Sequence, residues 1–149
     1  ALKIIDNPTS DEELILKNFK YRGNTAVIHF DESIMPKNKK AWCSWNSSMS
    51  ADNIEKTSVT YWLNQLQNLK IDKNIFLTIN PFREIPANKT FKKVMFTHPY
   101  FDADALTNQS NLQKIQNKKN ILFCGSYFGY GFHEDGIKSS IEMLKMLND

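Results

Sequence analysis

TAVIHFD, residues 25–31, is the first of five short segments in which β-branched and aromatic residues predominate. The other four are AWCSWN (41–46), TSVTYWL (57–63), NIFLTIN (74–80) and FKKVMFT (91–97). Segments of this length and composition favour β-strands. Because they follow one another along the chain, they predict a largely antiparallel sheet of about five strands.

Helical patterns lie on both sides of these strands. Ser10 and Glu13 fit a capping box, which predicts a helix over about residues 11–18. A second helix is predicted over about residues 102–116. The apolar residues expected to face inward are Leu14, Ile15 and Phe19 in the first helix and Leu106, Leu112 and Ile115 in the second.

The end of the chain predicts one more strand and one more helix. ILFC (121–124) has strand composition, and a helix is predicted over about residues 134–148. The apolar residues of this helix recur at the spacing of one buried face, and they are Ile137, Ile141, Leu144 and Leu147. Together the patterns predict an α+β fold with helices flanking the sheet and a terminal strand and helix.

Length, composition and charge restrict the class of protein. The chain has 149 residues, of which 41% are hydrophobic, enough for one ordinary domain with its own core. The formal charge of +3 is spread over many lysines, whereas a nucleic-acid-binding protein concentrates its positive charge on one stripe or helix. A nucleic-acid partner is therefore not expected.

The cysteines, the histidines and the longest apolar runs exclude several further classes. Cys43 and Cys124 each lie in an apolar segment, which favours two buried thiols in a reducing compartment over a disulfide. The histidines and cysteines have no metal-ligand spacing, so no metal is expected. No apolar run is long enough to span a bilayer and no signal peptide is recognisable, which predicts a cytoplasmic protein without a transmembrane segment.

Four of the five glycines fall within GSYFGYGFHEDG, residues 125–136. Glycine allows backbone N–H groups to approach a ligand, and the first helical turn supplies unpaired amides. The glycine spacing matches neither the dinucleotide fingerprint nor the phosphate loop. Glu134 and Asp135 would repel a phosphate, so the expected ligand is a nearly neutral ring edge, such as the pyrimidine side of a flavin. The alternative is that the glycines form tight turns and the two carboxylates cap the helix.

The segment ILFCGSYFGYGFHEDGIKSS (121–140) resembles the C-terminal flavin-contacting segment of flavin-containing amine oxidases. It is most similar to the branch of amine-oxidase-like NAD/FAD-binding oxidoreductases found near cyclopropane-fatty-acid synthases. Earlier segments resemble the same branch in the same order, and they are AVIHFDESIMP, AWCSWN, SVTYWLNQLQNL, FLTINP and THPYFDADAL. The resemblance implies FAD as the cofactor and a Rossmann-like domain upstream of Ala1. It assigns residues 1–119 to the substrate domain and residues 120–149 to the strand, turn and helix that complete the FAD-binding domain.

The resemblance also implies cofactor contacts within the glycine turn. Gly131, Phe132 and His133 match the turn that meets the flavin ring, with the amides of His133 and Glu134 directed at the flavin O2 edge. Ser126 stands where many members have a Glu, so the contact of that carboxylate is missing here. The expected cofactor-binding residues are Gly125, Ser126, Gly131, Phe132, His133, Glu134 and Gly136.

A second set of residues is expected to line a substrate cavity. In the strand predicted over residues 41–46, Trp42, Ser44 and Asn46 share one face, and an aromatic side chain beside two hydrogen-bonding groups is typical of a pocket wall. A dry core is the alternative. Phe132 matches a family position on the substrate side of the ring. The expected substrate-lining residues are Trp42, Ser44, Asn46, Tyr61 and Phe132, and no catalytic residue emerges.

The expected function is that of the C-terminal part of an FAD-dependent oxidoreductase, which accepts hydride from a C–N or C–C bond of a small-molecule or lipid-like substrate onto the flavin. The isolated chain is expected to be inactive and to bind FAD weakly or not at all, and its self-association is left open. His29 is expected to be a hydrogen-bonded histidine, either buried or at the sheet edge. The alternative function is a free-standing α+β module that binds an apolar ligand or a protein partner.

Overall fold

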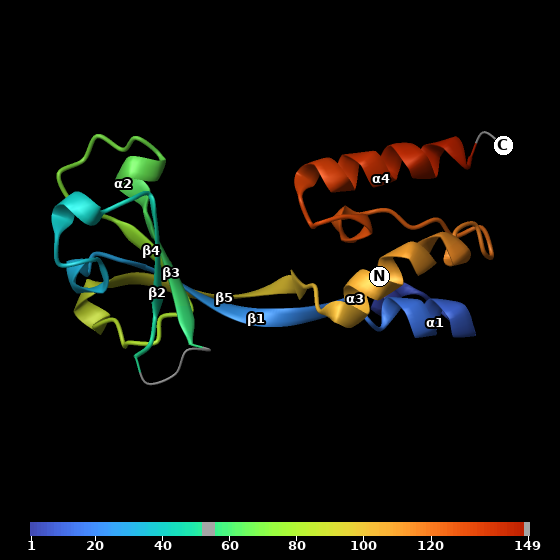
Figure 1. The fold of residues 1–149 in the computed structure, drawn as a ribbon, viewed down its shortest axis with the longest axis horizontal. Coiled ribbons are helices and arrows are strands. Elements are labelled where there is room, and N and C mark those ends of the chain that lie inside the picture. The colour runs from blue at the N-terminus through green and yellow to red at the C-terminus, as the bar shows by residue number, and fades with distance from the viewer. Residues whose placement is uncertain (52–55, 148–149) are drawn as a thin grey trace. The chain divides into compact units, whose positions relative to one another are not determined.

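The computed structural model describes residues 1–51 and 56–147. Its sheet has five strands in the order β2-β3-β4-β1-β5 (Figure 1). The strands are β1 Lys20–His29, β2 Trp45–Met49, β3 Thr57–Trp62, β4 Phe76–Ile79 and β5 Thr90–Tyr100. The pairs β2–β3, β3–β4 and β4–β1 are antiparallel. The predicted α+β fold with a five-stranded antiparallel sheet and flanking helices is confirmed.

Three helices lie close to the positions that the sequence predicts, whereas the short helix at Leu63–Leu66 was not predicted. The helices are α1 Ser10–Leu16, α2 Leu63–Leu66, α3 Ala103–Gln109 and α4 His133–Lys145. A 3-10 segment, Ser110–Ile115, continues α3, so the helix expected over residues 102–116 is present with its second half more tightly wound. The predicted end of the last helix at residue 148 falls outside the described residues.

The chain divides into two compact units. The helical unit comprises Ala1–Arg22 and His98–Asp149, and the sheet unit comprises Gly23–Thr97. Residues 120–147 pack within the helical unit, together with residues 1–22. The resemblance implies a domain boundary between residues 119 and 120, and this boundary stays a prediction.

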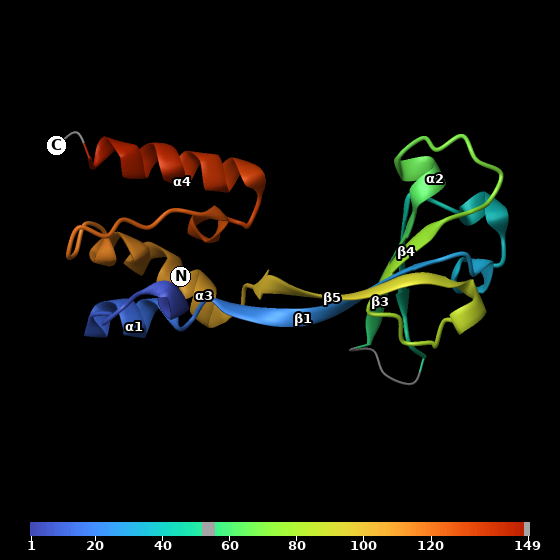
Figure 2. The ribbon, with the colours of Figure 1, turned by 180° about the vertical axis from the view of Figure 1, so that it is seen from behind.

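The core of the helical unit is formed by five buried residues from three segments, Ile15, Leu16, Leu112, Ile115 and Phe123. Half-buried apolar residues pack around them, among them Phe19, Tyr127 and Phe128. In Figures 1 and 2 the coil that carries residues 117–132 runs between α4 and the pair α1 and α3. Leu106 was expected to face inward, but it is exposed, and Ala105 takes the buried position instead.

Helix α1 begins one residue before its predicted start. Its capping box joins Thr9 and Glu12: the Glu12 amide donates to Thr9 Oγ1 at 3.2 Å, and the Thr9 amide donates to Glu12 Oε2 at 2.6 Å. The sequence holds two overlapping capping boxes, Thr9 to Glu12 and Ser10 to Glu13. With the first box, Ile15 and Leu16 are buried and Leu14 remains exposed, so packing selects the register.

The sheet unit has a core that mixes apolar and polar side chains. Its buried apolar residues are Ala26, Val27, Met35, Phe76 and Ile85. His29 is fully buried, and its Nε2 lies 2.7 Å from Thr78 Oγ1, while its Nδ1 accepts the Asp31 amide at 3.1 Å. Because Nδ1 accepts, Nε2 carries the proton and donates to Thr78. Of the two placements expected for His29, buried or at the sheet edge, the structure has the buried one, with both ring nitrogens hydrogen-bonded.

Two predicted strands differ from the structure. The strand expected at residues 41–46 begins only at Trp45, because the Asn46 side chain bonds to both the N–H and the C=O of Cys43 and turns the chain there. The strand expected at residues 121–124 is absent, and an isolated bridge joins Lys118 and Ile121. Within that segment the Gln116 side chain, rather than a neighbouring strand, bonds to the backbone of Phe123.

Candidate functional site

The segment before the glycine turn is extended, and two polar side chains hold one of its edges. The Gln116 amide pairs with both backbone groups of Phe123, at 2.8 Å to the N–H and 2.7 Å to the C=O. The Ser139 hydroxyl accepts the Gly125 amide at 2.9 Å and lies 3.1 Å from the Gly125 carbonyl. No hydrogen bond to the backbone of Leu122 or Cys124 is found within residues 1–51 and 56–147. The opposite edge, which carries the backbone groups of Leu122 and Cys124, is therefore open to a further strand.

Two glycines of the turn adopt backbone angles that other residues avoid. Gly125 has φ 147° and Gly131 has φ 95°. Between them a 3-10 turn, Ser126–Phe128, is closed by hydrogen bonds from the amides of Gly129 and Gly131 to the Ser126 carbonyl. The glycines are therefore required here by the path of the chain itself.

Asp135 fastens the turn to the start of α4. Its Oδ2 accepts the amides of Tyr130 at 3.0 Å and Phe132 at 2.9 Å. A Cβ on Gly129 would collide with the Asp135 carboxylate, so only glycine leaves room for this clamp. The capping role that the sequence left open for Asp135 is present, and the carboxylate covers the amide of Phe132, one of the expected cofactor-binding residues.

The next amides of α4 are free of protein partners. The first hydrogen bond of the helix runs from the Gly136 amide to the Phe132 carbonyl. Among the described residues no acceptor is found for the amides of His133 and Glu134, and both residues are exposed. The two donors expected to meet a flavin edge are thus accessible, at the positive end of a 13-residue helix.

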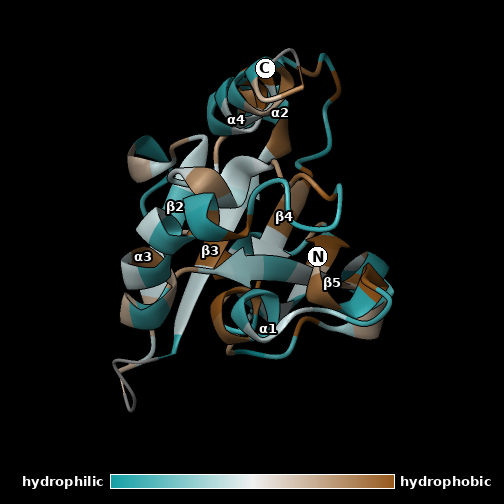
Figure 3. Cartoon of the chain, turned by 90° about the vertical axis from the view of Figure 1, so that its right-hand side faces the viewer, coloured by the Kyte–Doolittle hydropathy of each residue, from teal (hydrophilic) through white to brown (hydrophobic). Residues whose placement is uncertain are grey.

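Helix α4 packs through the opposite face from the predicted one. Gly136, Ser139 and Met143 face the turn and the loop beneath it. The apolar residues expected to be buried are exposed by 50 to 63%: Ile137, Ile141, Leu144 and Leu147. The face with the small residues Gly136 and Ser139 packs against the turn because it allows the chain at Gly125 to approach closely enough for the Ser139 hydrogen bonds. In Figure 3 helix α4 carries both hydrophobic (brown) and hydrophilic (teal) residues.

A cavity of about 560 Å³ lies beside the glycine turn. Ser126 and Tyr127 of the turn line it, together with residues from the start of the chain, the start of β1 and the end of β5. Phe101 connects the cavity to the turn, because its ring lies against the Cα of Gly131. Of the expected cofactor-binding residues, only Ser126 lines this cavity.

Charged groups cluster at the entrance to α3. Lys20 Nζ lies 2.9 Å from Asp102 and 3.5 Å from Asp104. The hydrogen bond and the charge of Asp102 raise the pKa of Lys20, and the hydrogen bond from Lys20 lowers the pKa of Asp102. Asp102 also accepts the Ala105 amide and caps α3, so the ion pair fixes β1 to the helix start.

The expected substrate-lining residues other than Phe132 lie in the sheet unit. Trp42 packs edge-on against Trp62 and Phe76 and donates its indole N–H to the Pro36 carbonyl at 2.8 Å. Tyr61 packs against Trp45 across the strand pair. The Ser44 carbonyl accepts the Trp62 amide, and Asn46 makes the turn at Cys43. Because β2 starts at Trp45, the expected shared face of Trp42, Ser44 and Asn46 does not follow from strand alternation.

The remaining sequence expectations concern thiols, metals and membranes. Cys43 and Cys124 are both free thiols, but neither is buried as expected: Cys124 is half-buried, and Cys43 is exposed because the Asn46 turn carries it outward. Within the described residues no group of three or more metal-ligating side chains comes together. In the same residues no helix is long and apolar enough to cross a membrane.

Sequence reasoning missed two features of this site. Tyr127, Phe101 and Lys17 are brought to one cavity from segments far apart in the sequence, and no spacing rule joins them. The bonds from the Tyr130 and Phe132 amides to Asp135 were predictable in part, since a carboxylate in a first helical turn after glycines is a capping signal.

Comparison with known proteins adds no identification. No family model matches the sequence. No curated protein matches it either.

Proposed function

We propose that this chain forms the C-terminal part of an FAD-dependent oxidoreductase that accepts hydride from a C–N or C–C bond of a small-molecule or lipid-like substrate. The observation that carries the proposal is the pair of accessible amides on His133 and Glu134, at the start of a helix that follows a glycine turn. Such a helix end stabilises the negative charge that develops on a flavin during reduction.

The uncovered surface of the helical unit supports the same proposal. The backbone edge at Leu122 and Cys124 is open, and the apolar face of α4 is exposed. An FAD-binding domain that added a strand to this edge and packed on α4 would cover both. The resemblance of several motifs in the same order is the second support.

The reading frame upstream of Ala1 provides the first test. We expect the same reading frame to encode a strand followed by G-x-G-x-x-G some hundreds of residues upstream of Ala1. We also expect FAD to copurify with the longer protein. Flavin fluorescence should show no tight stoichiometric binding of FAD to the isolated chain. A start codon directly before Ala1, or tight FAD binding by the isolated chain, contradicts the proposal.

A pair of variants at His133 tests the amide contact in the longer protein. His133 is the first helical residue, where proline is tolerated, and the extended backbone of Phe132 is compatible with a following proline. His133→Pro removes the N–H donor, so the bound flavin should be reduced less readily and its potential should fall. His133→Ala keeps the donor and should leave the potential unchanged. An equal effect of both variants would assign the effect to the side chain and overturn the backbone contact.

The alternative is a free-standing module that binds a protein partner through the apolar face of α4. The exposed side chains of Ile137, Ile141 and Leu144 favour it. A start codon directly before Ala1, together with a partner whose binding is lost in Ile141→Lys, would support this alternative over the flavoenzyme.

A further inference from the structure

The cavity of the helical unit has a wall that the flavin proposal does not use. Its volume of about 560 Å³ falls within the roughly 300–1,000 Å³ of small-molecule sites. Five aromatic residues from three segments line it, namely Phe19, Tyr21, Tyr100, Phe101 and Tyr127. An aromatic wall of this kind fits the apolar part of a ligand.

The charged residues of the same cavity have one sign. Lys3, Lys17 and Lys20 line it, and among the described residues no Asp or Glu does. Lys20 is paired with Asp102 and Asp104. For Lys3 and Lys17 no ion pair is found in the described part of the chain. Two uncompensated ammonium groups therefore accompany the apolar wall and favour an anion over a cation.

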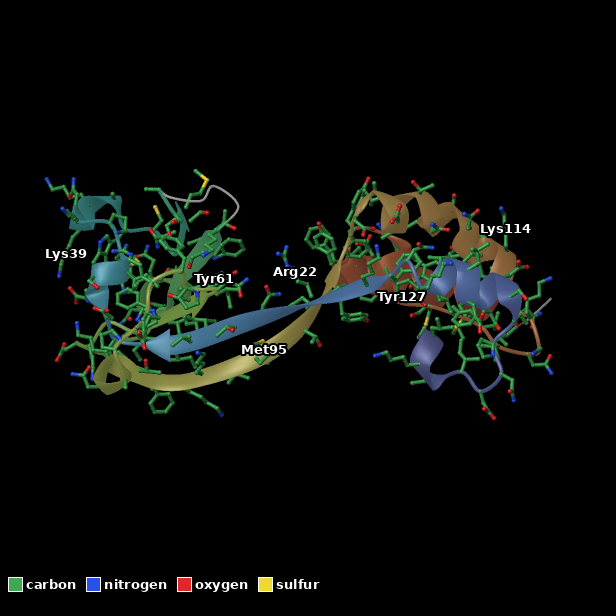
Figure 4. All side chains as sticks on the ribbon, turned by 90° about the horizontal axis from the view of Figure 1, so that it is seen from below. Arg22, Lys39, Tyr61, Met95, Lys114 and Tyr127 are labelled. Carbon is green, nitrogen blue, oxygen red and sulfur yellow. The ribbon has the colours of Figure 1, made fainter. Side chains whose placement is uncertain are left out.

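Tyr127 adds a hydrogen-bond donor to the cavity. Its ring packs on Phe19 with centroids 5.2 Å apart and on Phe128 at 5.0 Å, which fixes the side chain. Burial raises the pKa of Tyr127 to about 12, so the phenol is protonated at neutral pH. Within residues 1–51 and 56–147 no partner is found for its hydroxyl (Figure 4 shows the side chain). The hydroxyl can therefore donate to a ligand oxygen.

We propose that this cavity binds an amphiphilic monocarboxylate, such as a medium-chain fatty acid, with its hydrocarbon part against the aromatic wall. The carboxylate accepts a hydrogen bond from the Tyr127 hydroxyl and pairs with Lys17 or Lys3. This site is independent of the flavin proposal, because it uses the space lined by Phe19 and Tyr127 and not the amides of α4.

The test is a calorimetric titration of the full chain with dodecanoate, kept below its micellar concentration. Saturable binding of one dodecanoate per chain is expected, with clearly weaker binding of dodecyltrimethylammonium, which has the same chain length and the opposite charge. Tyr127→Phe should weaken dodecanoate binding by about tenfold or more, because a hydrogen bond to a charged group is lost. Lys17→Gln should weaken it severalfold.

Matched control variants separate the site from general effects. Tyr130 is 81% exposed and lies outside the cavity lining, so Tyr130→Phe should leave binding unchanged. Lys114→Gln removes the same charge as Lys17→Gln at a position that does not line the cavity. Far-UV circular dichroism checks the fold of each variant. Should Tyr127→Phe unfold the chain, Lys17→Gln and the cationic amphiphile decide the outcome.

Three results would overturn the proposal: no saturable dodecanoate binding, equal affinity for the cationic amphiphile, or equal losses in the site and control variants. FAD is titrated in parallel. Weak FAD binding with saturable dodecanoate binding supports both proposals, whereas tight FAD binding without dodecanoate binding overturns both.

Discussion

Ser139 on helix α4 bonds to both backbone groups of Gly125. Its Oγ accepts the Gly125 amide at 2.9 Å and lies 3.1 Å from the Gly125 carbonyl and 2.8 Å from the Gly136 carbonyl. One buried hydroxyl thus replaces the neighbouring strand at the point where the chain enters the glycine turn. The position of the whole turn relative to α4 depends on this contact.

Ser139→Ala should destabilise the helical unit by about 1–3 kcal/mol, because the half-buried N–H and C=O of Gly125 lose their partner. Urea unfolding followed by circular dichroism measures the change. Ser140→Ala is the matched control, since the Ser140 hydroxyl donates to the Gly136 carbonyl within its own helix at 2.9 Å. Equal effects of the two variants would show that the Gly125 contact is unimportant.

Asp135→Asn should loosen the glycine turn. The carboxylate accepts two amides, and an Asn side chain accepts less strongly and brings an NH₂ group toward Gly129. A loss of about 1 kcal/mol is expected, together with faster hydrogen exchange of the Tyr130 and Phe132 amides. Glu134→Gln, at an exposed residue of the same turn, should change neither quantity. Unchanged exchange in Asp135→Asn would contradict the clamp.

The sheet unit should lose stability as the pH falls below about 6.5, the usual pKa of histidine. Burial lowers the pKa of His29, and the charge of Asp31 opposes this shift only in part. The unfolded chain therefore takes up a proton at a higher pH than the folded chain, which favours unfolding in acid. Urea midpoints from pH 7.5 to 5 measure the effect. His29→Gln should flatten this dependence, and a wild-type midpoint that is constant over the range would exclude it.

The Tyr127 phenol should titrate at a higher pH than an ordinary tyrosine. Burial raises its pKa to about 12, so the absorbance of phenolate should rise in a late phase that is missing in Tyr127→Phe and present in Tyr130→Phe. Because the unfolded residue ionises near pH 10, stability should fall as the pH rises from about 10 toward 12. A titration curve that is the same in both variants would place Tyr127 in solvent.

The apolar face of α4 should promote self-association of the isolated chain. Ile141 is 50% exposed, so Ile141→Lys should change the free energy of unfolding by less than about 0.5 kcal/mol. The same variant should lower the average mass in sedimentation equilibrium at high concentration. Glu142→Gln alters the charge by the same amount on the adjacent position and should have no such effect. A monomeric wild-type chain would show that this face does not self-associate.

Local patterns in the sequence predicted most elements of this fold. The segments at residues 57–63, 74–80 and 91–97 became β3, β4 and β5 within a few residues, because β-branched and aromatic side chains suit a pleated, half-buried surface. Failures occurred where side chains take over the bonding of the backbone. Asn46 delayed the start of β2, and Gln116 and Ser139 kept residues 121–124 out of a ladder.

In the candidate site, too, some features were determined by the sequence alone and others by the tertiary structure. Sequence alone determined the glycine turn and the helix that follows it, because turn residues and helical periodicity act over a few neighbouring residues. Only the tertiary structure decided which face of α4 is buried: two faces share the helical spacing, and the one with Gly136 and Ser139 packs because it allows the closer approach. The gathering of Tyr127, Phe101 and Lys17 around one cavity was also decided there, since it depends on contacts between residues far apart in the chain.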